Sequence, residues 1–135
     1  RALKNSKMLS ADVNAGYDPL YAEVFEKNNS AYVGKGAAIS KYTGARGKSG
    51  SNDANAEYLG ILRKAFDDAK VEYQTAELGR IDAGGGGTIA YIPAAYGMDV
   101  IDIGVPILNM HAPYEVSSKS DVYETTKCYK AFYEN

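Results

Sequence analysis

Two residues of types that bind metal ions follow strand-like segments of this sequence. Asp12 lies near the end of the apolar run 8–13, and His111 follows a second strand-like segment that begins with residues 98–104. Open α/β sheets bind ligands at the carboxyl ends of their strands, so both side chains are expected near a ligand site. A carboxylate and an imidazole are common zinc ligands. The same spacing also fits an ordinary alternative, in which Asp12 is a cap and His111 a surface group.

A complete metal site requires more ligands than these two. Zinc in proteins takes three or four nitrogen, oxygen or sulfur ligands from side chains. His111 is the single histidine among the 135 residues. Any zinc held here must therefore also use carboxylates or residues outside this sequence. The residue types predict an incomplete site.

Glycine-rich segments offer a different kind of ligand site. Residues 84–87 are four consecutive glycines, which let the backbone approach a ligand, and a helix expected to open at Thr88 offers free N–H groups to an anion or carboxylate. The segment lacks the Lys-Ser/Thr of a phosphate-binding P-loop, and residues 44–49 also depart from that pattern. The ordinary alternative for 47–49 is a solvent-exposed basic loop. A phosphate-ligand enzyme stays open as a hypothesis.

Nucleophilic catalysis has little support in this sequence. A serine triad would need His111 as its base, and no nucleophile-elbow sequence precedes a helix. Cys128 lies in a helical pattern and is predicted to be a core residue. As the only cysteine it cannot form an internal disulfide, which favours a reducing compartment and hence the cytoplasm.

The composition is that of a soluble globular domain. Hydrophobic residues make up 45% and charged residues 24%, and the net charge of -2 comes from acidic and basic residues scattered along the chain. No basic stripe is available to neutralise phosphates, so nucleic acid is not an expected partner. The longest apolar stretches are too short to cross a bilayer, so no membrane association is expected.

Hydrophobic periodicity and turn residues predict alternating strands and helices. Strands are expected at 8–13, 37–42, 71–76 and 98–104, helices at 52–69, 88–96 and 119–133, weak helical character at 18–29, and a loop at 44–50. Ser51 or Asn52 is the expected cap of the first long helix, and Pro93 is expected to bend the second. This order predicts an α/β fold with helices packed on a largely buried sheet.

Four segments together resemble a known enzyme family. They are Ser-Ala-Asp-Val-Asn-Ala at 10–15, the segment 36–54, Gly-Gly-Thr-Ile at 86–89, and Asp-Ile-Gly-Val-Pro-Ile-Leu-Asn-Met-His-Ala-Pro at 102–113. In motifs and in order they resemble the aspartyl and vacuolar aminopeptidases, which are dinuclear zinc metallopeptidases. The resemblance covers nearly the whole chain. It implies a three-layer α/β/α zinc-peptidase-like fold, with residues 1–135 as the C-terminal portion of the catalytic domain.

The resemblance also implies roles for individual residues. Asp12 of the Ser-Ala-Asp motif and His111 of the Met-His motif would be terminal ligands, one to each of two divalent ions, with zinc expected and cobalt or manganese as alternatives. The implied substrate-binding residues are Gly86, Gly87, Thr88 and Lys41. Relatives that prefer acidic substrates carry histidines just after the Ser-Ala-Asp motif, where this chain has Asn14, Gly16 and Tyr17. The preferred N-terminal residue of the substrate therefore stays open.

Several parts of the family's site are expected outside this chain. They are a further histidine, a bridging aspartate, an adjacent Glu-Glu pair that includes the general base, and an inserted dimerisation domain, all of which lie earlier in the family's sequence. This chain has no adjacent Glu-Glu. We therefore expect a fragment, inactive alone, of a cytoplasmic homo-oligomeric aminopeptidase, with the remainder of that enzyme and a peptide substrate as partners. The alternative is a non-catalytic α/β binding or assembly domain derived from the same fold.

Overall fold

A mixed β-sheet with its two long helices on one face organises the computed structural model, which describes residues 1–46, 49–80 and 86–135. The strands are β1 (Lys7–Ala15), β2 (Ala37–Ser40), β3 (Tyr42–Ala45), β4 (Ser49–Asp53), β5 (Tyr73–Thr75), β6 (Asp99–Leu108) and β7 (Val116–Ser117). The α-helices are α1 (Ala56–Asp68), α2 (Tyr91–Ala94) and α3 (Lys119–Glu134), and the 3-10 helices are η1 (Leu3–Asn5), η2 (Pro19–Val24) and η3 (Lys27–Asn29). The predicted α/β class is confirmed.

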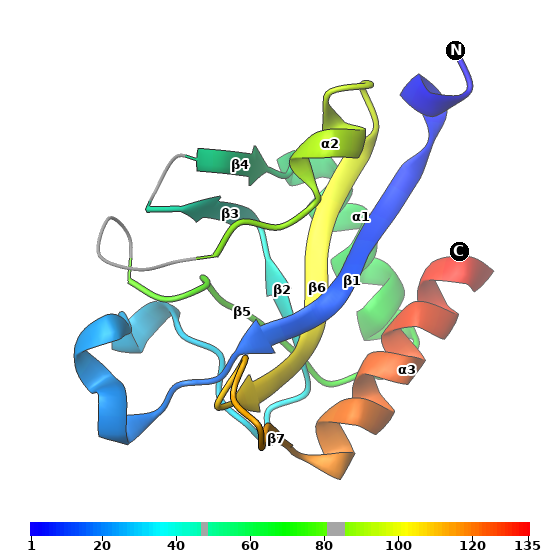
Figure 1. Cartoon of the computed structure of the whole chain (residues 1–135). Coiled ribbons are helices and arrows are strands. Elements are labelled where there is room, and N and C mark those ends of the chain that lie inside the picture. The colour runs from blue at the N-terminus through cyan, green and yellow to red at the C-terminus, as the bar shows by residue number, and fades with distance from the viewer. Residues whose placement is uncertain (47–48, 81–85) are drawn as a thin grey trace.

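Strand β6 is the centre of the main sheet, whose order is β1-β6-β2-β5, with β7 paired to the end of β6 (Figure 1). β1 runs parallel to β6, β2 runs antiparallel to it, and β5 runs parallel to β2. Within the described residues, β1 pairs on one side only. β6 continues through Pro106, which lies between the residues that pair with β2 and those that pair with β7. The missing N–H of this proline therefore interrupts neither the ladder with β2 nor the ladder with β7.

Helices α1 and α3 cover one face of the sheet (Figure 1). Their buried side chains pack with apolar strand residues into one core, formed by Ala37, Ile39, Ala54, Tyr58, Leu62, Ala65, Phe66, Val71, Ile101, Ile103, Cys128 and Ala131. Side chains alternate along a strand, so Asp102 and Gly104 of β6 belong to the opposite face from Ile101 and Ile103. That opposite face carries buried polar residues, among them Asp102, Ser40 and Asn14. α2 and the β3–β4 hairpin lie on its side (Figure 1).

The start of α1 differs from the prediction. The N-cap is Asn55, whose side chain accepts the N–H of Tyr58 at 2.6 Å, and the predicted caps Ser51 and Asn52 belong to β4. The predicted loop at 44–50 is also wrong in part, because β3 and β4 pair there as an antiparallel hairpin. Asn52 is buried and donates to the Val100 carbonyl at 3.1 Å, so tertiary contacts hold these turn-forming residues in a strand.

Two predicted helices are shorter in the structure. The expected helix 88–96 is the four-residue α2, and Pro93 lies in its first turn, where the absent N–H has no intrahelical acceptor and no bend results. The segment 18–29 forms η2 and η3, with the Asp18 side chain accepting the N–H of Leu20 at 2.9 Å. Among the described residues, no helix is long and apolar enough to span a membrane.

Asp121, in the first turn of α3, ties that helix to the loop before β2. Its carboxylate is completely buried and accepts the N–H groups of Gly34 at 2.6 Å and Gly36 at 2.9 Å. A carboxylate there is also favoured by the N-terminal end of the helix dipole. Asp121 therefore supplies acceptors to two backbone donors, of which the Gly36 N–H would otherwise be buried without a partner.

Replacing Asp121 by alanine should lower the free energy of unfolding by about 3 kcal/mol, since it leaves both N–H groups unpaired. Urea unfolding measures the change. The control is Asp68→Ala, because Asp68 is exposed and pairs only with Lys64 at 2.6 Å on the surface of α1. That exposed pair is screened by solvent and should contribute little to stability. Equal effects of the two substitutions would contradict the structural role of Asp121.

Candidate functional site

Asp12 lies on the exposed edge strand β1. The strand extends to Ala15, so Asp12 stands three residues before its end, and its register partner on β6 is Gly104. The side chain is exposed, and its Oδ1 accepts the N–H of Val13 at 2.8 Å. Among the residues that the structure describes, none forms a hydrogen bond with Oδ2. This carboxylate can therefore accept a further ligand.

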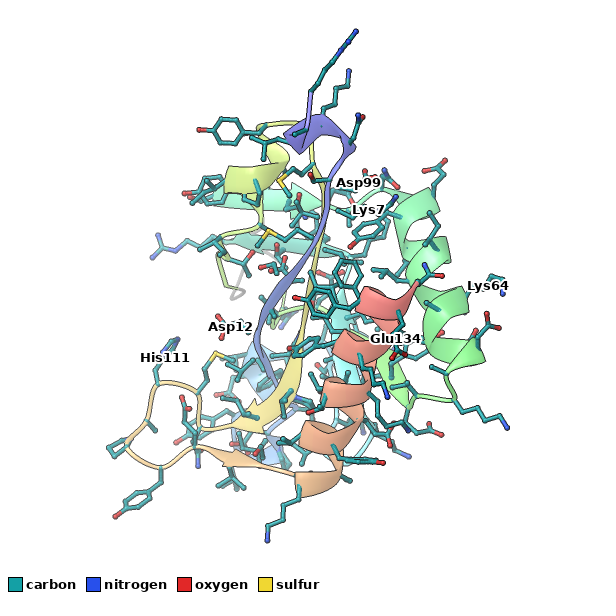
Figure 2. All side chains as sticks on the ribbon, turned by 90° about the vertical axis from the view of Figure 1, so that its right-hand side faces the viewer. Lys7, Asp12, Lys64, Asp99, His111 and Glu134 are labelled. Carbon is teal, nitrogen blue, oxygen red and sulfur yellow. The ribbon has the colours of Figure 1, made fainter. Side chains whose placement is uncertain are left out.

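His111 lies in the loop that joins β6 to β7. Its φ of 70° and the φ of 59° at Asn109 are left-handed, a conformation that non-glycine residues adopt only where their surroundings hold it. One such contact is visible, because the His111 N–H donates to Glu115 Oε1 at 2.7 Å. The imidazole is exposed on the same side of the molecule as Asp12 (Figure 2).

One pocket brings most of the predicted site residues together. It has a volume of about 630 Å³, and Asp12, His111, Gly86, Gly87 and Thr88 all line it. The other described lining residues are Val13, Ala15, Val24, Phe25, Leu78, Gly79, Met110 and Glu115. These residues come from β1, η2, the segments on both sides of the undescribed stretch 81–85, and the β6–β7 loop. We refer to this cavity as the Asp12–His111 pocket.

Lys41 is not among the described residues that line the Asp12–His111 pocket. Its ammonium pairs with Asp53 at the base of the β3–β4 hairpin. Its charge also reaches Glu77, where burial and the nearby Asp53 carboxylate raise the pKa of the carboxyl and Lys41 opposes that rise. A role for Lys41 toward a substrate stays a prediction.

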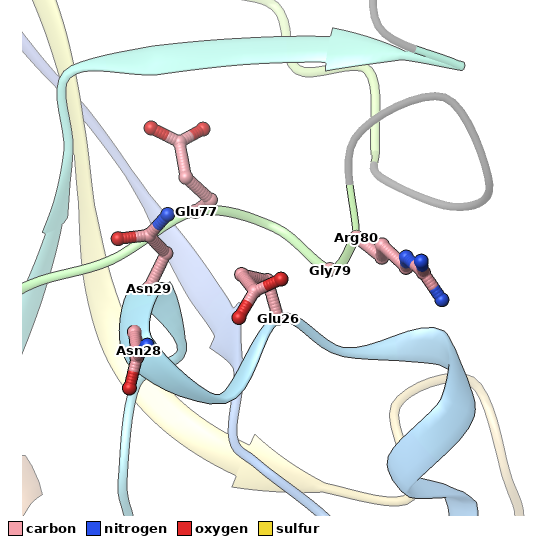
Figure 3. Close-up of a pocket in the computed structure, with 6 residues that line it drawn as sticks. All are labelled: Glu26, Asn28, Asn29, Glu77, Gly79 and Arg80. Carbon is pink, nitrogen blue, oxygen red and sulfur yellow. The ribbon is translucent and has the colours of Figure 1, made fainter.

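A smaller cavity of about 360 Å³ adjoins the first at Gly79. Its lining is polar and was not predicted from the sequence: Glu26, Asn28, Asn29, Glu77, Gly79 and Arg80 (Figure 3). The Arg80 guanidinium extends away from the Glu26 and Glu77 carboxylates (Figure 3). Backbone hydrogen bonds fix the segment that lines this cavity. The Glu77 N–H donates to the Asn29 carbonyl at 2.6 Å, and the Arg80 N–H donates to the Val24 carbonyl at 2.8 Å.

The donors in the Asp12–His111 pocket fit part of a metal site. Asp12 and His111 offer an oxygen and a nitrogen, whereas the third titratable lining residue, Glu115, uses an oxygen to hold the His111 backbone. Among the residues that the structure describes, no group of three or more histidine, cysteine, aspartate or glutamate side chains is placed to hold a metal ion. A complete zinc site needs at least three ligands, so further donors would come from outside the described residues.

The glycine segments give little support to a phosphate site. Gly84, Gly85, Gly47 and Lys48 lie outside the described residues. The expected helix at Thr88 begins only at Tyr91, so the Thr88 N–H is not part of a helix N-terminus. Gly86 and Gly87 do line the Asp12–His111 pocket, and their role toward a ligand stays a prediction.

Cys128 is a core residue, as its helical pattern predicted. It is fully buried beneath α1 and the sheet, and burial raises the pKa of its thiol to about 12, with the nearby Glu124 carboxylate adding to the rise. Only the thiolate reacts readily with alkylating agents. Iodoacetamide at about pH 8 should therefore modify Cys128 far more slowly in the folded protein than in urea. Equal rates in a mass-spectrometric time course would contradict this burial.

Comparison with known proteins shows which family the chain matches. The chain matches the family model described as aminopeptidase I zinc metalloprotease (M18) over residues 1–133. It is 62% identical over 135 residues to a probable M18 family aminopeptidase 1 of Clostridium acetobutylicum. That alignment covers 100% of this chain but 29% of the relative. The chain thus spans under a third of the length of the curated relatives it matches.

Solved structures agree with the family match. The crystal structure of aminopeptidase I from Clostridium acetobutylicum aligns with a TM-score of 0.92 at 62% identity, over 98% of this chain and 29% of that one. The M18 family aminopeptidase of Thermotoga maritima aligns with a TM-score of 0.90 at 46% identity, over 96% of this chain and 29% of that one. The S. cerevisiae mApe1 dodecamer, 24% identical, shares the fold over 98% of this chain and 28% of that one, with a TM-score of 0.74. This chain belongs to the aminopeptidase I zinc metalloprotease (M18) family.

Proposed function

We propose that the full-length protein is a metal-dependent aminopeptidase and that residues 1–135 form the C-terminal portion of its catalytic domain. The observation that carries this proposal is the Asp12–His111 pocket in a chain of the M18 family: two metal-ligand types far apart in sequence line one cavity with Gly86, Gly87 and Thr88. The reaction is the hydrolysis of the N-terminal residue from a peptide.

In this proposal Asp12 and His111 each hold one of two divalent ions. Zinc is the metal named by the family, and cobalt and manganese are the alternatives that a metal analysis distinguishes. Two such ions, when bound, activate a water and polarise the scissile carbonyl. The remaining ligands and the general-base glutamate come from the rest of the protein, which agrees with the absence of any three-donor group among the described residues.

The chain's own contribution is to position ligands and substrate. β1 holds the Asp12 backbone against β6, and Glu115 holds the left-handed backbone of His111, so contacts within this chain fix the backbone that carries both side chains. Gly86, Gly87 and Thr88 bring backbone close to the peptide at the other side of the pocket. Glu115 is the acidic group of the described lining that is not a proposed metal ligand, and it favours a ligand with N–H donors.

Assembly and location extend the same proposal. The S. cerevisiae relative mApe1 is a dodecamer, and we infer a homo-oligomer here as well. Exposed apolar side chains such as Leu20, 83% exposed, and Tyr114, 85% exposed, suit further burial against another part of the protein or a second subunit.

The single buried thiol of Cys128 agrees with a cytoplasmic location.

The proposal is tested by comparing the full-length protein with the segment 1–135. Leucyl-, aspartyl- and glutamyl-anilides present one apolar and two acidic N-terminal residues, and each is assayed with added zinc, cobalt or manganese. We expect the full-length protein to hydrolyse at least one of them and the segment to hydrolyse none. A full-length protein that is folded but inert with every metal would favour the non-catalytic binding or assembly domain instead.

A further inference from the structure

A chain of hydrogen bonds, buried at Asp102 and partly buried at Thr88, leads from β6 to the Asp12–His111 pocket. Asp102 is 6% exposed, and its Oδ2 accepts the hydroxyl of Thr43 at 3.0 Å. Thr43, on β3, is 1% exposed, and its Oγ1 lies 3.3 Å from the Oγ1 of Thr88. Thr88 Oγ1 also accepts the N–H of Ala90 at 3.3 Å. Thr88 lines the pocket, so the chain ends at the site.

The direction of each bond follows from the number of protons available. A carboxylate only accepts, and each threonine hydroxyl has one proton and two acceptor positions. Thr43 gives its proton to Asp102, so in the contact between the two threonines Thr88 must be the donor. Thr88 uses one acceptor position for the Ala90 N–H. Thr88 Oγ1 therefore keeps one free acceptor position, whereas its only proton is already donated to Thr43.

Apart from the proposed metal ligands, the described lining has the same preference. Glu115 is a carboxylate, and no lysine or arginine occurs among the described lining residues. A ligand that presents N–H groups therefore complements the Thr88 hydroxyl and the Glu115 carboxylate, whereas a ligand that presents only acceptors does not. A peptide supplies such groups in its backbone amides and its terminal amine.

We propose that Asp102 and Thr43 are positioning residues that hold the Thr88 hydroxyl as a hydrogen-bond acceptor for an N–H group of the bound peptide. The inference rests on the proposed aminopeptidase function, which it deepens by giving two buried residues outside the metal ligands a part in substrate binding. Asp102 acts through Thr43. It accepts the Thr43 proton and so orients the Thr43 oxygen to accept the single proton of Thr88, which could otherwise point to a ligand.

The test uses the full-length enzyme and the anilide that it hydrolyses best. Thr43→Val keeps the shape of the side chain but removes the proton that Asp102 accepts, and Thr88→Val removes the acceptor itself. Thr88→Val should raise KM about tenfold, the ratio expected for one lost hydrogen bond of ordinary strength, with kcat nearly unchanged. Thr43→Val keeps the Thr88 acceptor but frees its proton to turn toward the ligand, so it should raise KM by a smaller, measurable factor, again with kcat nearly unchanged. Thr43→Ser and Thr88→Ser keep the hydroxyls and should restore the KM of the wild type.

The matched control is Thr125→Val, because Thr125 is 2% exposed in α3 and its Oγ1 has no hydrogen-bond partner among the residues that the structure describes. It should leave KM and kcat unchanged. An unchanged KM in Thr43→Val, or a rise that Thr43→Ser does not reverse, overturns the inference. If Thr43→Val does not fold, the test relies on Thr88→Val, which should fold because Thr88 is only half-buried. An unchanged KM in Thr88→Val also overturns the inference. A wild type that hydrolyses no anilide overturns the proposed function itself.

Discussion

Replacing Asp12 or His111 by alanine in the full-length protein is expected to lower kcat/KM by at least about 100-fold. Loss of a group that only orients a metal ligand already costs about 10-fold to 100-fold, and loss of the ligand itself should cost no less. Each substitution should also reduce the bound metal from about two ions to about one per subunit. Anilide hydrolysis and elemental analysis measure the two effects on the same samples.

The stability of these variants separates a ligand from a structural residue. Both side chains are exposed, so each substitution should change the free energy of unfolding by less than about 0.5 kcal/mol. Asp68→Ala is the control for the loss of an exposed carboxylate away from the pocket, and it should retain full activity and metal. Variants of Asp12 and His111 that keep their metal and their rate would show that neither residue is a ligand.

Gly104→Ala is expected to cause the largest loss of stability, about 3 kcal/mol or more. A Cβ at Gly104 would lie 2.0 Å from the carbonyl oxygen of Asp12 and 2.6 Å from its carbonyl carbon. Both are backbone atoms of β1, so the clash can be relieved only by moving the two strands apart. Activity should fall as well, because the displaced backbone is that of a proposed metal ligand.

Gly60→Ala is the matched control for this substitution. Gly60 is exposed within α1, and a Cβ there meets nothing within 4 Å. Alanine is the better helix former, so this change should raise the free energy of unfolding by about 0.5–1 kcal/mol. Urea unfolding of both variants gives the comparison. Similar values for Gly104→Ala and Gly60→Ala would contradict the close approach of β1 and β6.

The elements with strong periodicity could be predicted, and those held by distant contacts could not. α1 follows from its repeated apolar residues, and β1 and β6 follow from their apolar runs, because in each case the sequence itself carries the burial pattern. β4 has the sequence Ser-Gly-Ser-Asn-Asp, which favours a turn, and its pairing depends on β3 and on the Asn52 contact with β6. No local pattern contains that information.

The site shows a similar division. Spacing alone left Asp12 and His111 open between ligands and ordinary residues, and only the family motifs assigned them to metals; the structure then places both on one pocket. Asp102 and Asp121 were not singled out, because a buried carboxylate is recognised by partners that come from remote segments. Thr43 lies 59 residues before Asp102, and Gly34 lies 87 residues before Asp121.

The most direct test of the account is the metal content of the full-length protein, measured together with its aminopeptidase activity before and after chelation. We predict about two divalent ions per subunit, loss of hydrolysis when a chelator removes them, and recovery when zinc, cobalt or manganese is restored. The segment 1–135, treated in the same way, should hold less metal and remain inactive. A full-length protein that is free of metal, or whose hydrolysis survives complete removal of metal, would contradict the assignment of Asp12 and His111 to a dinuclear site.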